Sequence, residues 1–256
     1  MNLKEAVIII TGGGTGVGSA CAQELAKCGA RVVIGYNKSK EGAIATKKKC
    51  KALGSDAITI QGDVALDDDC KKIVSKTIDQ WGRIDGLVNN AGITKFAAPN
   101  DLDALSSQDF IDLYSTNVVG SYQMLRACSE HLKTSRGSVV NVSSIAGIKA
   151  IGSSTAYVAS KAALNAMTVA LARGLAPEIR INAVCPGLVD TEWHSKRFSD
   201  EEYKSFLEKY EKTVPLEEAA APKDIADTIL WLLSSARLIT GETILVDAGL
   251  HLGKPM

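Results

Sequence analysis

Short apolar runs alternate with longer helix-like stretches along the whole chain. The apolar runs are rich in β-branched residues at consecutive positions, which is typical of strands buried on both faces. They cover residues 6–10, 31–35, 57–61, 84–89, 138–142, 179–184 and 243–246. The stretches between them have helical periodicity and cover residues 16–28, 40–53, 67–81, 107–132, 155–176 and 222–233.

Strict alternation of strand and helix predicts a parallel sheet that is covered by helices on both faces. We therefore expect an α/β protein with a doubly wound, seven-stranded parallel sheet. No linker divides the chain, and 256 residues fit a single domain over 1–256. Residues 187–215 break the rhythm with a polar, charged stretch that includes a predicted helix over 200–212. Because this stretch follows the end of a strand, it is either a substrate lid or a plain surface excursion.

Composition excludes several classes of protein. Lysine plus arginine equals aspartate plus glutamate at 29 each, so we expect no nucleic-acid or membrane-surface partner. The six cysteines form no Cys-x-x-Cys pair and no histidine cluster accompanies them, so we expect no metal site and buried, reduced thiols. No signal peptide or membrane span is visible, and we therefore expect a cytoplasmic protein.

A glycine-rich turn directly follows the first predicted strand. Residues 11–18 read Thr-Gly-Gly-Gly-Thr-Gly-Val-Gly and open the first predicted helix. Gly12 allows a tight turn, Gly16 allows a pyrophosphate to approach the backbone, and Gly18 allows the helix to pack closely. The free N–H groups at the helix start favour phosphate. A purely structural turn is the alternative interpretation, but the position of this one in a βα series favours dinucleotide binding and a Rossmann fold.

Tyr157 and Lys161 are four positions apart on a predicted helix and therefore share one face. A lysine ammonium at about 4 Å, with an effective dielectric of about 20, lowers a tyrosine pKa by roughly 3 units. The positive charge of an oxidised nicotinamide ring would add to this effect, and together we expect them to bring the pKa of Tyr157 near neutrality, as general acid–base catalysis requires. Ser143 and Ser144 follow the fifth predicted strand, where a hydroxyl can bind a substrate carbonyl or simply cap a turn.

Taken together, these motifs make the sequence resemble the short-chain dehydrogenase/reductase family over essentially its whole length. The matching segments occur in the family's order and spacing: Thr11–Gly18, Asp63–Val64, Asn89–Gly92, Asn117, Ser144, Tyr157 with Lys161, Asn182, Pro186–Gly187 and Thr191.

The resemblance implies a catalytic set of four residues. Tyr157 would exchange a proton with the substrate oxygen, and Lys161 would depress the pKa of Tyr157 and bind the nicotinamide ribose. Ser144 would orient the carbonyl, since it lies 13 positions before Tyr157 as in the family, with Ser143 as the alternative. Asn117 would hold a water that continues the proton relay.

The resemblance also implies the residues that hold an NADP or NAD cofactor. Those expected to contact it from the glycine turn and the following loops are Gly12, Gly14, Thr15, Gly16, Val17, Gly18, Asp63, Val64, Asn90, Ala91, Gly92, Tyr157, Lys161, Pro186, Gly187, Val189 and Thr191.

The end of the second strand bears on which cofactor is used. Tyr36 stands where an acid would bind the ribose diol of NAD and repel the 2′-phosphate of NADP. Lys38, Ser39 and Lys40 follow and could bind that phosphate, with Asn37 as a further donor. NADP is therefore the expected cofactor. NAD is the alternative, with the lysines as solvated residues of a helix start.

We expect an enzyme that interconverts a carbonyl and a secondary alcohol of a small molecule. Within the family, the sequence resembles both the 3-oxoacyl-carrier-protein reductases and the glucose dehydrogenase-like members. The possible substrates are therefore a 3-oxoacyl thioester, a sugar, a steroid or a small alcohol. Ser135 and Glu178 stand where bacterial carrier-protein reductases have arginines, which weakens the first of these possibilities. A non-catalytic dinucleotide sensor is a less favoured alternative, because the catalytic set is intact.

Residues expected to line the substrate come from 93–98, 145–152 and 187–212, and they slightly favour a neutral substrate. The helices over 107–132 and 155–176 are apolar or small on more than one side, which requires a partner besides the sheet. We expect these helices to pair in a homotetramer, with a dimer as the alternative.

Overall fold

The computed structural model describes residues 1–195 and 198–253, without the side chains of residues 194 and 195. Its centre is one sheet of seven parallel strands in the order β3-β2-β1-β4-β5-β6-β7. The strands are β1 (Val7–Ile10), β2 (Arg31–Tyr36), β3 (Ala57–Gln61), β4 (Gly86–Asn89), β5 (Ser138–Val142), β6 (Arg180–Pro186) and β7 (Thr243–Val246). The order reverses beside β1, between β1 and β4, which is where proteins of this topology bind ligands.

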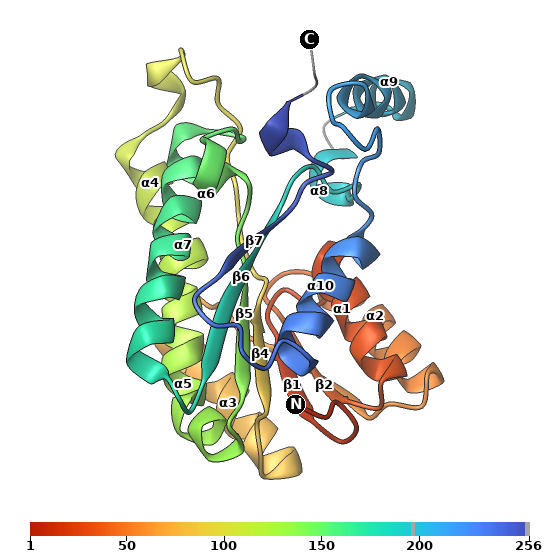
Figure 1. Cartoon of the computed structure of the whole chain (residues 1–256), viewed down its shortest axis with the longest axis vertical. Helices are drawn as coiled ribbons and strands as arrows, with labels where there is room; N and C mark the ends of the chain where they lie inside the picture. The colour runs from red at the N-terminus through yellow and green to blue at the C-terminus, as the bar shows by residue number, and fades with distance from the viewer. Residues whose placement is uncertain (196–197, 254–256) are drawn as a thin grey trace.

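Helices cover both faces of the sheet (Figure 1). On one face lie α1 (Gly16–Lys27), α2 (Lys40–Ala52) and α10 (Pro222–Ser234). On the other face lie α3 (Asp67–Trp81), α4 (Ser107–Tyr114), α5 (Gly120–Ser135) and α7 (Thr155–Leu175). The short helices α6 (Ala146–Lys149) and α8 (Glu192–Ser195), with α9 (Asp200–Glu211), lie beyond the carboxyl ends of the strands. The predicted doubly wound α/β fold is confirmed.

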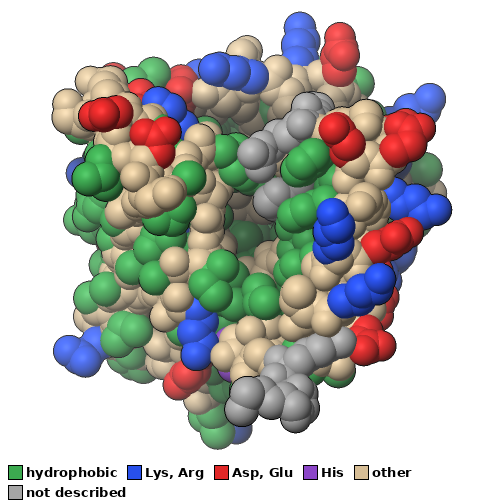
Figure 2. Space-filling model, turned by 90° about the horizontal axis from the view of Figure 1, so that it is seen from above, with side chains coloured by type: hydrophobic (Ala, Val, Ile, Leu, Met, Phe, Trp, Pro, Cys, Tyr) green, Lys and Arg blue, Asp and Glu red, His purple; other side chains and the backbone are tan. Residues whose placement is uncertain are grey.

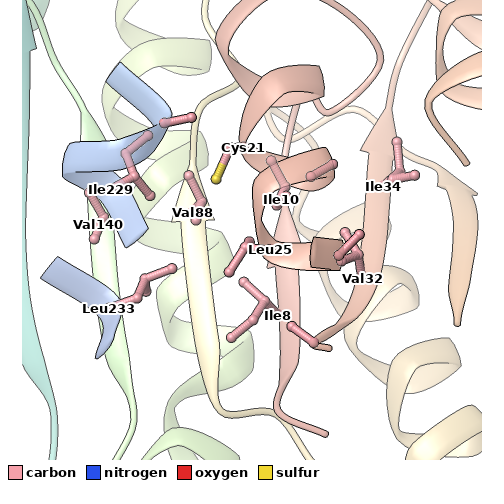
Figure 3. Packing of buried hydrophobic residues seen from close by; sticks show 14 of the residues in the cluster. Ile8, Ile10, Cys21, Leu25, Val32, Ile34, Val88, Val140, Ile229 and Leu233 are labelled. Atoms are coloured by element: carbon pink, nitrogen blue, oxygen red, sulfur yellow. The ribbon is translucent and has the colours of Figure 1, made fainter. Parts of the chain in front are cut away.

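The core has two layers because neighbouring residues of a strand point to opposite faces. Ile8 and Ile10 of β1 pack toward α1 and α10, as Figure 3 shows, whereas Ile9 packs toward α3, α5 and α7. All three side chains are fully buried. Burying an isoleucine of this kind stabilises the fold by about 1.5–3 kcal/mol. The consecutive apolar residues in the sequence are therefore explained by a strand that has two buried faces.

The stretch 107–132, which the sequence pattern predicts as one helix, is interrupted. A π-helical turn (η2, Ser115–Val119) separates α4 from α5. Such a turn inserts an extra residue into the helix and is frequent at functional sites. The inserted turn includes Asn117, whose carbonyl oxygen accepts a bond of 3.1 Å from the Ser121 hydroxyl. Hydrophobic periodicity does not register one added residue, so the sequence pattern missed this break.

The stretch 187–215 carries α8 and α9 after β6. The helix predicted over 200–212 is present as α9, and a reciprocal bond between Ser199 and Glu202 caps its start. Within the described part of the chain, no helix has the length and apolar character needed to cross a membrane. The same part contains no cluster of potential metal ligands. Five cysteines are buried as expected, but Cys28 at the end of α1 is exposed.

Candidate active site

A cleft of about 530 Å³ opens at the carboxyl edge of the sheet. Figure 2 looks onto this edge and shows a central hollow between two halves of the molecule. The loops that follow β1, β2, β3, β4, β5 and β6 all contribute to its lining. Of the residues predicted to bind cofactor or to act in catalysis, all but four line this one cleft: the exceptions are Gly14, Gly18, Lys40 and Asn117.

The glycine turn between β1 and α1 forms one wall of the cleft. Gly12 has φ +63° and Gly16 has φ +49°, a left-handed conformation that favours glycine. A Cβ on Gly16 would point into the cleft, 3.4 Å from Thr191 on the opposite side. A Cβ on Gly18 would lie only 2.4 Å from the Gly12 carbonyl oxygen, which explains why Gly18 supports the turn from behind without lining the cleft.

Gly14 also lies behind the cleft surface. A Cβ there would meet the Ser39 hydroxyl at 2.7 Å, so Gly14 allows the turn to pack against the start of α2. Gly14 and Gly18 do not line the cleft, and their contact with a cofactor stays a prediction. Their physical role is close packing of the backbone, and a repeat of glycines in sequence does not separate this role from ligand contact.

The loops after β1 and β4 are tied together beside the glycine turn. The Thr11 hydroxyl accepts bonds of 3.0 Å from the backbone N–H groups of Asn90 and Ala91. The Asn90 side chain in turn donates to the carbonyl oxygens of Thr11 and Gly12, both at 3.0 Å. These bonds fix the backbone on the two sides of the point where the strand order reverses.

The loops after β2 and β3 form the end of the cleft that is farthest along the sheet. Tyr36 is buried at the end of β2, and the Asn37 amide donates a bond of 2.7 Å to the Asp63 carboxylate. Lys38 and Ser39 line the cleft, whereas the exposed Lys40 does not. Lys38 is therefore the basic side chain that the described loop offers to a ligand at this end.

The loop after β6 forms the opposite wall of the cleft. The Gly187 N–H donates a bond of 3.0 Å to the Val246 carbonyl oxygen, and a Cβ on Gly187 would lie 2.9 Å from the Asp247 Cα. This close approach of β6 and β7 explains the glycine. Pro186, Val189 and Thr191 then run along the cleft as predicted.

Tyr157, Lys161 and Ser144 meet where β5 and α7 border the cleft. The side chains of Ser144 and Tyr157 are hydrogen-bonded to each other. Ser144 also accepts a bond of 3.1 Å from the Ala146 N–H, so its own hydroxyl hydrogen remains able to reach a ligand. The Ser143 hydroxyl instead donates to the Lys161 carbonyl oxygen at 3.2 Å, which favours Ser144 as the residue that faces substrate.

The Lys161 ammonium is bonded to the backbone rather than to the Tyr157 hydroxyl. It donates a bond of 2.9 Å to the Val142 carbonyl oxygen and lies 5.6 Å from the Tyr157 ring centroid. Burial lowers the pKa of Lys161 to about 8 and raises the pKa of Tyr157 to about 12. Without a bound cofactor, Lys161 does not bring the pKa of Tyr157 toward neutrality, and the predicted joint effect of Lys161 and an oxidised nicotinamide ring stays a prediction. Desolvation outweighs a charge that is held against a backbone oxygen.

Asn117 lies behind the cleft, where its side chain is fully hydrogen-bonded. Its oxygen accepts a bond of 2.9 Å from the Ile93 N–H, while its nitrogen donates to the Ile93 carbonyl oxygen at 3.1 Å and to the Ser160 hydroxyl at 3.0 Å. Ser160 donates to the Tyr157 carbonyl oxygen at 2.8 Å. Asn117 therefore connects the loop after β4 with the helix that carries Tyr157 and Lys161.

Several residues of the cleft are missing from the sequence-based set. These are Thr11, Gly35, Gly62, Ile73, Thr116 and Val142, whereas Glu192 and Trp193 fall within the stretch 187–212 that was expected to line the substrate. Thr11 lies within the recognised turn, and its position at the end of β1 could have indicated its role. Trp193 falls within the predicted lid, but nothing in its local sequence shows that an exposed indole faces the cleft.

This combination of fold and cleft defines a dinucleotide-binding α/β protein. A family model described as enoyl-(acyl carrier protein) reductase matches residues 12–251. A protein described as a ketoacyl reductase of the granaticin polyketide synthase of Streptomyces violaceoruber is 37% identical, over 96% of this chain and 96% of its own. A 3-oxoacyl-[acyl-carrier-protein] reductase of Staphylococcus epidermidis is 34% identical, over 95% of this chain and 98% of its own.

The crystal structure of a short-chain dehydrogenase/reductase described as glucose/ribitol dehydrogenase from Brucella melitensis superposes with a TM-score of 0.87. It is 31% identical, and the match covers 97% of this chain and 98% of that one. The chain belongs to the short-chain dehydrogenase/reductase family, and it is an oxidoreductase.

Proposed function

We propose that the protein is an NADP-preferring carbonyl reductase in which Tyr157 donates the proton. The observation that carries this proposal is the convergence of Tyr157, Lys161 and Ser144 on the cleft that the glycine turn also lines. A dinucleotide sensor without catalytic activity would not require this convergence. The enzyme reading is therefore preferred over the sensor.

The residues around the cleft fit a nicotinamide dinucleotide. Gly12 and Gly16 leave a cradle that a Cβ would fill, at the N-terminus of α1 where phosphate is favoured. Asp63, Val64, Asn90, Ala91 and Gly92 would hold the adenosine half, and Pro186, Gly187, Val189 and Thr191 the nicotinamide half. When bound, NADPH supplies a hydride to the carbonyl carbon and leaves as NADP⁺.

Tyr157 would complete the reaction by giving its phenolic proton to the carbonyl oxygen, so that the ketone gains one hydride and one proton and becomes a secondary alcohol. Ser144 would hold that oxygen by a hydrogen bond. The Lys161 ammonium would replenish the proton on Tyr157 and bind ribose hydroxyls. Asn117 would act as a positioning residue, since its side chain holds the backbone of Ile93 beside the cleft.

Three observations support NADP over NAD. Tyr36 replaces the acid that would repel a 2′-phosphate, and Lys38 and Ser39 line the cleft nearby. Against this stands the Asp63 carboxylate, but the Asn37 amide donates to it at 2.7 Å and satisfies part of its hydrogen-bonding capacity. We infer a preference set mainly by Lys38, with NAD as a weaker alternative.

The proposed reaction can be tested by following deuterium from labelled NADPH into the alcohol product. The protein would be incubated with NADPH that carries deuterium at nicotinamide C4, together with a panel of ketoacyl thioesters, sugars, steroids and simple ketones. A reductase yields an alcohol whose mass is raised by one at the carbinol carbon. Tight binding of NADPH, without alcohol formation from any member of the panel, would instead support the sensor.

A further inference from the structure

Apolar side chains border the half of the cleft that contains Tyr157 and Ser144. Ile93 after β4 and Trp193 after β6 line the cleft itself, and both are about two-fifths exposed. Ile148 and Ile151 after β5, and Leu252 after β7, are further exposed apolar residues at the same edge of the sheet. Figure 2 shows hydrophobic side chains on both sides of the hollow.

Basic side chains are scarce in this half. Of the described residues that line the cleft, the charged ones are Lys38 and Asp63 after β2 and β3, and Lys161 and Glu192 near the catalytic groups. The Lys161 ammonium is bonded to the Val142 carbonyl oxygen. Lys95, which follows Ile93, forms an ion pair of 2.7 Å with Asp109. Lys149 on α6 is exposed beside Ile148 but does not line the cleft. Among the described residues that line the cleft near Tyr157 and Ser144, Lys161 is therefore the one lysine or arginine that a phosphate or carboxylate of the substrate would meet.

Two tyrosines of α9 hold the segment that precedes Trp193. The Tyr203 hydroxyl donates to the Asp190 carboxylate at 2.8 Å, and the Tyr210 hydroxyl accepts from the Leu188 N–H at 3.3 Å. Tyr203 also stacks with Phe206 and Phe198, at ring-centroid distances of 6.2 and 6.3 Å. The segment that leads from β6 to Trp193 is thus anchored to α9 at Leu188 and Asp190.

The opposite wall is fixed as well. Ile93 is held through both its N–H and its carbonyl by the Asn117 side chain. Ile93 and Trp193 are therefore two apolar groups in the cleft that also contains Ser144 and Tyr157. Aromatic side chains in such walls select flat apolar groups, and a small number of polar groups set the orientation.

We propose that the substrate is an uncharged ketone with a flat apolar body, such as an aryl or alicyclic ketone, and that Trp193 determines this specificity. The carbonyl oxygen contacts Ser144 and Tyr157, while the ring lies against Trp193 and Ile93. This proposal rests on the carbonyl reductase activity proposed above, and it disfavours coenzyme A and carrier-protein thioesters as substrates.

A matched set of substrates tests it. kcat/KM with NADPH would be measured for acetophenone and α-tetralone, for 4-acetylbenzoate as the charged counterpart of acetophenone, for 2-butanone, and for acetoacetyl coenzyme A. We expect the two uncharged aryl ketones to exceed 4-acetylbenzoate and acetoacetyl coenzyme A by about tenfold or more. Higher kcat/KM for either anion would overturn the proposal while leaving the reductase activity established.

Substitutions of Trp193 test whether this residue determines the preference for aryl ketones. Trp193→Ala is expected to lower kcat/KM for acetophenone about tenfold, mainly through KM, with little change for 2-butanone, and Trp193→Phe should restore most of it. Trp231→Ala is the control, because Trp231 on α10 is equally exposed at 42% and does not line the cleft. Equal kcat/KM values for Trp193→Ala and wild type would refute the role of Trp193. Failure of the wild type to reduce any of these compounds, or any sugar or steroid of the wider panel, would contradict the proposed function itself.

Discussion

In the proposed mechanism, Lys161 and Tyr157 set the pH range for ketone reduction. Burial lowers the pKa of Lys161 to about 8, so its ammonium is present below that pH and is lost above it. Burial raises the pKa of Tyr157 to about 12, so the phenol keeps its proton throughout the neutral range. If the reaction proceeds as proposed, we therefore expect reduction to depend on the charge of Lys161 rather than on the protonation of Tyr157.

We expect kcat/KM for ketone reduction to be level below about pH 8 and to fall about tenfold per pH unit above it. The measurement is a pH profile with saturating NADPH. A primary isotope effect from deuterated NADPH would verify that hydride transfer is being observed. A rate that rises between pH 8 and pH 9 would show that loss of a proton, rather than loss of the ammonium, controls the reaction.

At the end of β2, Lys38 and Lys40 provide a matched pair, since only Lys38 lines the cleft. Lys38→Ala should weaken NADPH binding and leave NADH binding nearly unchanged, because the lysine interacts with the 2′-phosphate alone. Lys40→Ala should alter neither. Wild type is expected to prefer NADPH by about 5- to 150-fold in fluorescence titrations. Equal or tighter binding of NADH by the wild type would exclude the NADP preference.

At the scale of elements, the π-helical turn and α7 are connected through Ser160. Its hydroxyl accepts from Asn117 and donates to the Tyr157 carbonyl oxygen. Ser160→Ala leaves the Asn117 amide with the Ile93 carbonyl as its remaining acceptor, so we expect kcat to fall about tenfold while KM for NADPH changes little.

The matched control is Ser129→Ala, which removes the same kind of bond from a serine hydroxyl to the carbonyl three residues earlier, at 2.9 Å, on the outside of α5. Both variants should unfold at similar temperatures. An unchanged kcat for Ser160→Ala, or an equal loss for the two variants, would show that Ser160 does not position the catalytic helix.

The elements themselves could largely be predicted from the sequence. Consecutive apolar residues identify strands such as β1 and β2 because both faces of this sheet are buried. The interruption at Ser115–Val119 could not be predicted, since a π turn preserves the overall hydrophobic stripe of the helix. The shift in the pKa of Tyr157 could not be predicted from the sequence either. Its direction depends on which atom the Lys161 ammonium is bonded to and on how deeply both groups are buried.

At the scale of the whole molecule, α4, α5 and α7 leave apolar side chains uncovered. Phe110, Ile111, Tyr122 and Val169 are all more than a third exposed on these helices. A homotetramer assembled through this face, as the sequence led us to propose, would cover them. The proposed alternative, a dimer, would use the same helices.

Val169→Glu tests this assembly, because a carboxylate buried between two copies lacks a compensating partner. We expect light scattering to show a tetramer for the wild type and smaller species for the variant. Ile44→Glu on α2, where Ile44 is 48% exposed, should leave the tetramer intact. A monomeric wild type at micromolar concentration would contradict the proposed assembly.

Sequence motifs placed most of the cleft correctly because they belong to turns whose backbone geometry is demanding, as with Gly12, Gly16 and Gly187. The residues that we expect to select the substrate were harder to predict. Trp193 reaches the cleft only because α8 follows β6 and α9 anchors the segment before it. Tertiary packing, rather than local sequence, determines that placement.

The most direct test of the account is the Tyr157→Phe variant. The ring would still pack beside Ser144 and Lys161, but the described site would lose the phenolic proton that we propose passes to the carbonyl oxygen. Ketone reduction should fall by at least about a hundredfold, while NADPH binds with nearly unchanged affinity. Retention of more than half of the wild-type rate would contradict the assignment of Tyr157 as the proton donor.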